Sequence, residues 1–223
     1  MSEVNNAMNK QIEELKKYNT PNISDAIDKL GINGQLYGIK PIQFGHRVAG
    51  PIYTVKYMSI GEEVTSSGDF LDEVPPGAII VIDNEGRTDC TSWGDLMTKV
   101  AIRNKIEATI INGACRDIDV IIELSYPIYA KGYYMRTAKD RVIMQGTNIP
   151  LSISGVLINP GDIAMADDSG VVVIPQNIFK EVLKLVKEIY EAEENIEKAI
   201  GEGDTLVGAR KKFKYHELQR KEK

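Results

Sequence analysis

The chain has 223 residues, of which 43% are hydrophobic and 26% are charged, and this length suits one well-packed domain better than two independent ones. Residues 210–223 hold seven Lys or Arg and two Glu, whereas residues 1–209 hold 20 basic and 30 acidic side chains. We therefore expect one domain over 1–209 and a solvated basic tail over 210–223. The acidic body gives little support for binding nucleic acid.

The N-terminal segment, residues 1–19, lacks the apolar core of a signal peptide. No apolar run approaches the ~18 residues that cross a membrane, so we expect a cytoplasmic protein without membrane contact. Residues 7–18 are predicted to form a short helix. A second helix follows, with Thr20 or Asn22 as the polar residue before it and Gly31 at its end.

The middle of the chain alternates strands and a helix. Residues 46–59 have the alternation and β-branched content of a strand, with Pro51 near an edge or bend. Residues 77–83 and 107–112 are predicted to be buried strands, and residues 95–106 between them an amphipathic helix. This is a βαβ unit, in which ligand sites gather at the C-terminal ends of the strands.

The last third of the chain is predicted to contain short strands and then the longest helix. Gly and Pro separate the strands within 127–137, 151–167 and 169–175. The helix covers residues 176–200. These elements predict an α/β fold.

Several polar residues should share the rim of the βαβ unit, namely Asp83, the loop 84–94 and the Arg116-Asp117 pair. Gly94 precedes a helix whose free backbone N–H groups and dipole favour an anion such as a carboxylate. Arg116 can clamp an anion, and Asp117 is a hard oxygen ligand for a divalent cation. Together they suit a 2-keto acid, whose carbonyl a metal would polarise and whose enolate it would stabilise.

The cysteine and histidine residues restrict the choice of metal. Cys90 and Cys115 are far apart and are expected to be reduced and packed, and His46 and His216 lack the spacing of metal ligands. Oxygen ligands would therefore dominate, which favours Mg²⁺ or Mn²⁺ over structural zinc.

Structural explanations compete with this functional one. An Arg-Asp pair after a strand is commonly a cap or an ion pair, and Asp95 alone is typical of the charge at a helix N-terminus. Glu193 lies within an apolar stripe of the long helix, where a carboxylate is costly unless it is paired. It is therefore either a functional carboxylate or a structural pairing, including one across a subunit boundary. The stripe consists of Val182, Val186, Ile189, Ile196 and Ile200.

The spacing of the rim residues resembles that of the metal-dependent 4-hydroxy-4-methyl-2-oxoglutarate / 4-carboxy-4-hydroxy-2-oxoadipate aldolases, which share a fold with the RNase E activity regulator RraA. The family signature is an Asp, twenty residues and Arg-Asp. Here Asp95 is followed by twenty residues and by Arg116-Asp117. The segments GDLM, NGACRD and NPGDIAMADDSGVVVIP also match, and the resemblance covers residues 16–207.

The resemblance implies an αββα sandwich similar to the swivelling phosphohistidine domain, RraA-like and with a long C-terminal helix. It also implies a homotrimer or homohexamer. The activity it implies is aldol cleavage to pyruvate and a second keto acid, together with decarboxylation of oxaloacetate through the same enolate.

Site roles follow from the same resemblance. Asp117 would coordinate the divalent metal, Asp95 would hold a metal-bound water, and Arg116 would bind the substrate keto oxygen and stabilise the pyruvate enolate. Glu193 is similar to a glutamate that reaches the metal site from a neighbouring subunit. The pyruvyl carboxylate would be bound by Gly94 and by the amides of Asp95, Leu96 and Met97.

The proton donor has no obvious candidate side chain. No histidine lies near the rim by sequence, so we expect a metal-bound water, positioned by Asp95 or Glu193, to transfer protons. Cys115 and Ser169 differ from the residues common in the family, but neither belongs to the signature.

Two functions fit these observations. The first is a divalent-metal-dependent lyase that acts on a pyruvate-derived 2-keto acid. The alternative is an RraA-like, non-catalytic, protein-binding regulator of ribonuclease activity. The regulator's pattern lacks the Asp after the Arg, whereas this chain has Asp117, which favours the enzyme. No residue pattern defines the distal half of the substrate.

Overall fold

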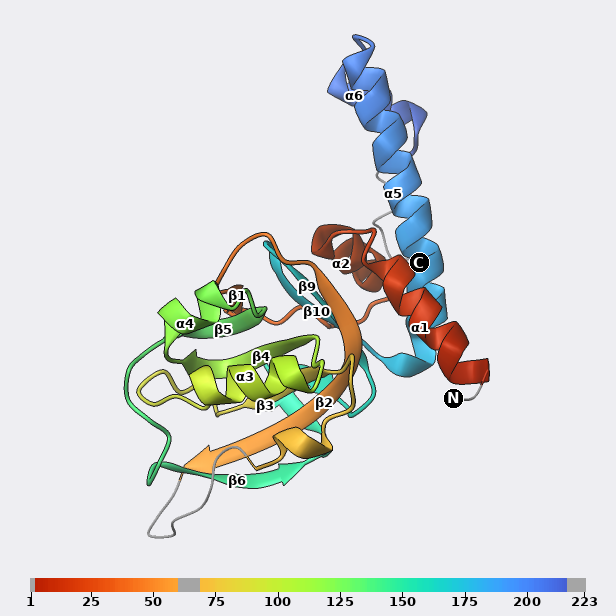
Figure 1. The fold of residues 1–223 in the computed structure, drawn as a ribbon. Coiled ribbons are helices and arrows are strands. Elements are labelled where there is room, and N and C mark those ends of the chain that lie inside the picture. Colours follow the sequence, from red (N-terminus) through yellow and green to blue (C-terminus); the bar gives the residue numbers. More distant parts are fainter. Residues whose placement is uncertain (1–2, 60–68, 216–223) are drawn as a thin grey trace.

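The computed structural model describes residues 3–59 and 69–215 (Figure 1). Within these residues, eight strands form one mixed sheet in the order β1-β5-β4-β3-β2-β9-β10, with β6 paired to β2. A separate hairpin joins β7 and β8. The strands are β1 (Lys40–Pro41), β2 (Val48–Ser59), β3 (Ile79–Asp83), β4 (Ala108–Cys115), β5 (Ile128–Tyr133), β6 (Val142–Thr147), β7 (Leu151–Ile153), β8 (Val156–Ile158), β9 (Ile163–Asp167) and β10 (Gly170–Ile174).

The centre of the sheet is parallel. Strands β2 to β5 run in one direction, with helix α3 (Asp95–Arg103) between β3 and β4 and helix α4 (Ile118–Glu123) between β4 and β5. Every residue of β3 and β4 is buried. One face of these two strands belongs to the same hydrophobic cluster as α3, and the other face packs against the β7-β8 hairpin. The predicted βαβ unit is confirmed, and the C-terminal ends of β3 and β4 lie side by side.

Strand β2 joins this parallel centre to an antiparallel half. It begins against β9, continues against β3 and ends against β6. Pro51, predicted near an edge or bend, is the last residue paired with β9. Beyond β9, the backbone N–H of Leu36, in the segment before β1, donates to the carbonyl of Val171 in β10 at 3.0 Å. The two ends of the sheet therefore meet, and the sheet is nearly closed.

Three helices pack on the outside of β9 and β10, away from α3 and α4 (Figure 1). They are α1 (Glu3–Leu15), α2 (Thr20–Lys29) and α5 (Phe179–Gly201). Helices thus lie on both sides of the sheet, and the predicted α/β fold with a long C-terminal helix is confirmed. None of the described helices is long and apolar enough to cross a membrane.

Helix α5 differs in two details from the prediction. It has 23 residues and is preceded by a 3-10 turn, η2 (Gln176–Ile178), where the prediction already placed helix. The stripe through Val182, Val186 and Ile189 is buried, but Ile200 is 41% exposed and was wrongly included. The C-terminal part of α5 extends beyond the body of the molecule (Figure 1), where Ile196 and Ala199 pack with Ala209 of α6 and Ile200 does not join that cluster.

Other boundaries also need correction. Helix α1 begins and ends earlier than the predicted 7–18, and the N-cap of α2 is Asn19 rather than Thr20 or Asn22. The Thr20 hydroxyl donates instead to Asp167 at 2.6 Å. Helix α6 (Leu206–Lys212) includes the start of the predicted basic tail, and residues 216–223 lie outside the described residues. A short 3-10 turn, η1 (Leu71–Glu73), precedes β3.

Candidate functional site

Four of the predicted rim residues, Gly94, Asp95, Arg116 and Asp117, lie together at the N-terminus of α3. Asp117 Oδ2 accepts a hydrogen bond from the backbone N–H of Asp95 at 3.1 Å, and Arg116 Nε lies 3.4 Å from the same oxygen. The backbone N–H of Arg116 donates to the Trp93 carbonyl at 3.0 Å, which fixes the turn after β4 against the loop before α3. The structure therefore brings together Gly94, Asp95, Arg116 and Asp117, and their chemical roles remain predictions.

A strained turn directs Asp117 toward α3. Asp117 has φ 57° and ψ 45°, the left-handed conformation, which is uncommon for a residue with a side chain and costs about 1 kcal/mol or more. Gly94 makes room for the carboxylate, because a Cβ at Gly94 would lie 2.6 Å from Asp117 Oδ2 and 3.2 Å from Arg116 Nε. The contact between the two loops therefore depends on the missing side chain of Gly94.

The start of α3 offers backbone donors. The N-cap residue of this helix is Gly94, which has no side chain to bond to the first-turn amides. The Asp95 N–H is bonded to Asp117, so the amide predicted to receive a substrate carboxylate is engaged by the protein's own carboxylate. The amides of Leu96 and Met97 belong to the same first turn, where the helix dipole favours an anion.

The Asp95 side chain is held as an ionised carboxylate. Lys99 Nζ donates to its Oδ2 at 2.8 Å, one helical turn away. This hydrogen bond is the largest cause of a lowered Asp95 pKa, and the Leu96 amide and Asp117 contribute in the same direction. Asp95 thus fits both explanations, a charge at the helix N-terminus and a carboxylate that orients water at the site.

Asp83 has a structural position, unlike the rest of the predicted rim. Its side chain is 5% exposed, it forms an ion pair with Lys56 at 2.6 Å, and it accepts a hydrogen bond from Asn112 at 2.6 Å. Asp83 thereby ties the ends of β3 and β4 together beneath the site.

A small cavity opens at the N-terminus of α3, beside Arg116. Its volume is about 190 Å³. Arg116 is 41% exposed in its side chain, so the guanidinium can reach a ligand there. The cavity is lined by Thr91, Ser92, Trp93, Gly94, Asp95, Leu96, Met97, Arg116 and Thr137.

The residues present fit a hydrated divalent cation. Among the described residues, no group of three or more His, Cys, Asp or Glu could hold a metal by itself. Asp117 is 35% exposed and lies beside a second carboxylate, Asp95. Mg²⁺ is commonly held by one or two carboxylates, with waters and substrate oxygens as the other ligands. Asp117 and Asp95 could therefore hold Mg²⁺ or Mn²⁺ together with a bound substrate.

The cysteines do not suit a metal or a nucleophilic role. Both Cys90 and Cys115 are free and buried, as predicted. Burial raises the pKa of Cys115 to about 12, so this thiol stays protonated at neutral pH. His46 lies within 3.4 Å of Gln43, away from the cavity, and His216 lies outside the described residues.

Within a single chain, Glu193 lies away from the other predicted site residues. It lies on α5, on the far side of β9 and β10 from α3 (Figure 1). Asn22 Nδ2 donates to its Oε2 at 2.5 Å, and the Tyr215 hydroxyl donates to its Oε1 at 3.5 Å. The predicted structural pairing is thus present. A role at the site would require a neighbouring chain and stays a prediction.

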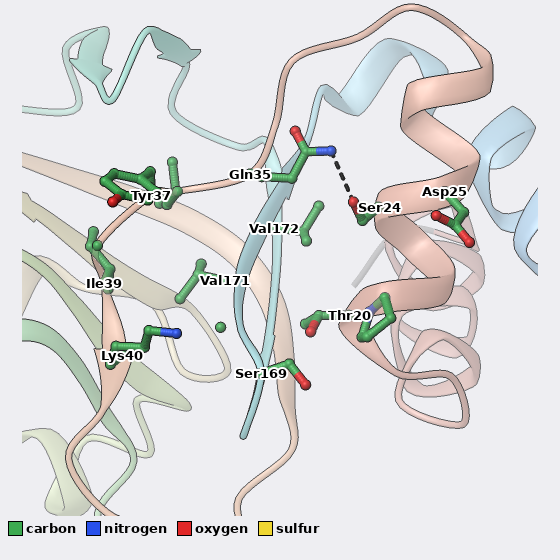
Figure 2. Close-up of a pocket in the computed structure, with 14 residues that line it drawn as sticks. Thr20, Ser24, Asp25, Gln35, Tyr37, Ile39, Lys40, Ser169, Val171 and Val172 are labelled. Atoms are coloured by element: carbon green, nitrogen blue, oxygen red, sulfur yellow. Dashed lines mark hydrogen bonds between the residues drawn. The ribbon is translucent and has the colours of Figure 1, made fainter. Parts of the chain in front are cut away.

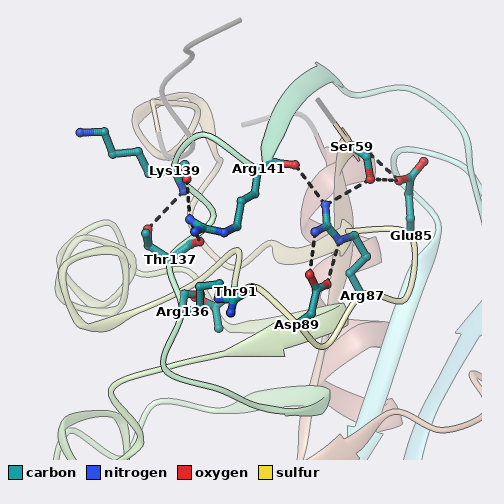
Figure 3. Close-up of polar contacts among 9 residues, drawn as sticks. All are labelled: Ser59, Glu85, Arg87, Asp89, Thr91, Arg136, Thr137, Lys139 and Arg141. Atoms are coloured by element: carbon teal, nitrogen blue, oxygen red, sulfur yellow. Dashed lines mark hydrogen bonds and ion pairs between the residues drawn. The ribbon is translucent and has the colours of Figure 1, made fainter. Parts of the chain in front are cut away.

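A polar network that was not predicted from the sequence lies beside the small cavity (Figure 3). Arg87 donates to both carboxylate oxygens of Asp89, at 2.9 and 2.8 Å, and to the Arg141 carbonyl at 3.0 Å. The Thr91 hydroxyl donates to the Arg136 carbonyl at 3.0 Å. These bonds join the loop before α3 to the segment after β5. The dense run of charges around Arg87 was the sequence feature that could have indicated this network. The carbonyl groups that accept from Arg87 and Thr91 lie far along the chain, in the segment after β5.

Another cavity, of about 670 Å³, lies between α2, residues 35–40 and β10 (Figure 2). Gln35 Nε2 donates to Ser24 Oγ across it at 3.0 Å. Lys40 and Asp25 are the charged residues in its lining. It contains none of the predicted site residues, so its size alone does not make it the better candidate.

Comparison with known proteins assigns the family. The chain belongs to the RraA-like family, described as Aldolase/RraA, whose sequence model matches residues 20–173. Protein DlpA from Legionella pneumophila is 43% identical over 209 residues, 92% of this chain but 34% of DlpA, so this chain spans about a third of that relative. A Halalkalibacterium halodurans protein named "Putative 4-hydroxy-4-methyl-2-oxoglutarate aldolase" is 34% identical over 206 residues, 89% of this chain and 92% of that protein.

Solved structures confirm the RraA-like fold. An uncharacterized protein from Pseudomonas syringae pv. tomato gives a TM-score of 0.87 at 40% identity, with 92% of this chain and 94% of that chain covered. RraAS2 from Streptomyces coelicolor, described as an unusual member of the RNase ES inhibitor RraA protein family, gives a TM-score of 0.78 at 26% identity, with 83% and 94% covered.

Proposed function

We propose that the chain is a divalent-metal-dependent lyase that acts on a pyruvate-derived 2-keto acid. Its reactions would be retro-aldol cleavage of the 4-hydroxy-4-methyl-2-oxoglutarate type and decarboxylation of oxaloacetate. The observation that carries the proposal is the placement of Arg116 and Asp117 against the N-terminus of α3, in the space that Gly94 leaves open. The relative that is named as an aldolase supports the reaction class.

Each residue has a binding role in this proposal. The substrate carboxylate lies at the first turn of α3, where the Leu96 and Met97 amides and the helix dipole favour an anion. Arg116 donates to the keto oxygen. Asp117 would hold Mg²⁺ or Mn²⁺, which would supply Lewis-acid polarisation of the keto group.

Both reactions break the bond between C3 and C4 and leave its electron pair on the pyruvyl half as an enolate. Arg116 stabilises the negative charge that develops on the C2 oxygen in the transition state. In the retro-aldol cleavage the C4 hydroxyl gives its proton to water and becomes a carbonyl, whereas in the decarboxylation C4 leaves as CO₂. C3 then takes a proton from water, which the Asp95 carboxylate orients, and pyruvate is formed.

The proposal includes assembly into a homotrimer or homohexamer. In one chain, Glu193 is bonded to Asn22 and is remote from Arg116. A neighbouring copy would have to supply Glu193 to the site. Light scattering of the purified chain measures the assembly, and Glu193→Gln tests whether turnover depends on this carboxylate.

A second candidate is protein binding without catalysis. The likeness to RraAS2 favours it, because that protein is described as belonging to an RNase ES inhibitor family. A regulator of this kind would not need the Asp117 carboxylate. Substitution of Asp117 therefore separates the two functions.

The deciding experiment measures pyruvate release from oxaloacetate and from 4-hydroxy-4-methyl-2-oxoglutarate, with Mg²⁺ or Mn²⁺ and then with EDTA. We expect metal-dependent turnover that Asp117→Ala abolishes, with the fold intact by circular dichroism. A folded protein that shows no turnover with either metal would contradict the lyase and leave the regulator as the better explanation.

A further inference from the structure

The candidate site is adjoined by a second cavity, which is separate from the cavity of about 670 Å³ beside α2. Its volume is about 420 Å³, compared with about 190 Å³ for the cavity at the N-terminus of α3, and Arg116 lines both. A 2-keto acid held by Arg116 and α3 would therefore border the second cavity. Asp117 also lines it, so two of the proposed site residues border this cavity.

The lining of this second cavity is mainly apolar. Besides Arg116 and Asp117, it consists of Ile118, Tyr133, Tyr134 and Met135. Tyr133 is 70% exposed and Met135 is 76% exposed, although β5 begins with fully buried residues. Large apolar side chains that stay exposed beside a polar site are typical of ligand-binding surfaces.

The charges around the cavity argue against a second carboxylate on the ligand. Arg116 is the one cationic side chain among the described residues that line it, and the proposed function assigns Arg116 to the keto oxygen. The guanidinium of Arg136 lies 5.9 Å from the centre of the Tyr134 ring and is engaged in a cation–π contact. A distal carboxylate would lose water here without gaining a cation, whereas an apolar group would gain from burial.

We propose that the second cavity binds the distal half of the substrate and selects an apolar or aromatic group over a carboxylate. This inference rests on the proposed lyase function and narrows its substrate class: 4-hydroxy-2-oxo acids whose C4 carries an alkyl or aryl group should be preferred to those whose C4 carries a carboxylate, such as 4-hydroxy-4-methyl-2-oxoglutarate. Tyr133 and Met135 are the specificity-determining residues, because both offer exposed apolar surface in the cavity.

The reaction itself is unchanged by this substrate class. Retro-aldol cleavage breaks the C3–C4 bond, and the electron pair stays on the pyruvyl half. The C4 hydroxyl proton passes to water, C4 becomes the carbonyl carbon of an aldehyde, and C3 takes a proton from water. The products are pyruvate and an apolar or aromatic aldehyde.

Calorimetric titration with 2-oxo-4-phenylbutanoate tests the subsite without catalysis, because this compound lacks the C4 hydroxyl and cannot be cleaved. In the presence of Mg²⁺ we expect it to bind at least about tenfold more tightly than pyruvate or 2-oxoglutarate, through burial of the phenyl group. Tyr133→Ala and Met135→Ala should each reduce this advantage and leave the affinity for pyruvate unchanged. Leu157→Ala is the control, since Leu157 is 62% exposed on β8 and outside the cavity.

Three results would overturn the inference. The first is tighter binding of 2-oxoglutarate than of the phenyl compound. The second is an equal loss of affinity for pyruvate and the phenyl compound in Tyr133→Ala. The third is an unchanged phenyl advantage in a Tyr133→Ala protein whose oligomer dissociates, which would make this surface a contact between copies of the chain.

Oxaloacetate turnover, measured in parallel, separates this inference from the proposed function. Turnover without a phenyl advantage would overturn the subsite and leave the lyase in place. A phenyl advantage that Tyr133→Ala removes, in a protein without turnover, would support the subsite as a binding site and contradict the lyase.

Discussion

Replacement of Gly94 by alanine should impair the candidate site while leaving the fold intact. Gly94 has φ −157° and ψ −165°, extended values that alanine adopts without strain. The new Cβ would lie 2.6 Å from Asp117 Oδ2, although Cβ atoms essentially never approach another atom within 3.0 Å. The carboxylate must therefore move by about 0.4 Å or more, away from the Asp95 amide that it accepts from.

The expected cost to stability is small and the cost to function is large. Alanine is a poorer N-cap than glycine, and the hydrogen bond to the partly exposed Asp117 is weakened, so the free energy of unfolding should fall by about 1 kcal/mol. Metal affinity and kcat/KM should fall about 10- to 100-fold, because both depend on the position of the carboxylate.

Urea unfolding and pyruvate release from oxaloacetate at several Mg²⁺ concentrations measure the two effects. Gly201→Ala is the matched control, since a Cβ there would meet nothing within 4 Å. Wild-type metal affinity and turnover in Gly94→Ala would refute the argument that the two loops are fitted to each other.

Three further changes test individual groups. Arg116→Lys should lower kcat for pyruvate release about 100-fold, because a single ammonium does not reproduce the guanidinium fork at the developing enolate oxygen; near-normal kcat would exclude that role. Asp95→Asn should lower kcat through loss of the carboxylate that orients water, and unchanged metal affinity together with unchanged turnover would contradict it. Burial raises the pKa of Cys115 to about 12, so the folded thiol should resist iodoacetamide at pH 8 and react after unfolding in urea. The pKa of Cys115 is higher in the folded chain than in the unfolded chain. Ionisation of this thiol should therefore leave the free energy of unfolding unchanged below about pH 8.5 and lower it as the pH rises toward 12, which urea midpoints at increasing pH would show.

The parallel centre of the fold was predictable because its signals are local. Strands β3 and β4 are apolar runs bounded by Pro-Gly and by polar residues, and α3 between them is amphipathic. Parallel connectivity then places Arg116 and Asp117 beside Gly94 without any further information. The grouping of these residues followed from topology, and the structure agrees with it.

The features that were missed depend on contacts between distant parts of the chain. The Thr20 hydroxyl, expected to cap α2, donates to Asp167 instead, 147 positions away. A structural pairing of Glu193 was predicted, but its partner, Asn22, lies 171 positions away and was not. The apolar cavity beside Arg116 arises because the end of β5 comes next to the turn after β4. None of these contacts leaves a periodic pattern in the sequence.

Strand β6 and helix α4 were missed for a different reason. Helix α4 has six residues, too few for an amphipathic repeat, and follows directly on the Arg116-Asp117 turn. Strand β6 is only partly buried and pairs with the end of β2 across a shift in register, so its alternation is weak.

The dependence of β2 on β9 has a consequence for the order of folding. The first residues of β2, such as Val48, pair with Ala166, so they have no partner strand until most of the chain has been synthesised. Strands β2 to β5 can assemble earlier, because their parallel pairing needs only residues up to Tyr133. Until β9 arrives, the other edge of β2 is open to wrong pairing, and such late, non-local closure slows folding. Helix α2, whose Thr20 also bonds to Asp167, is therefore made early and reaches its native place late.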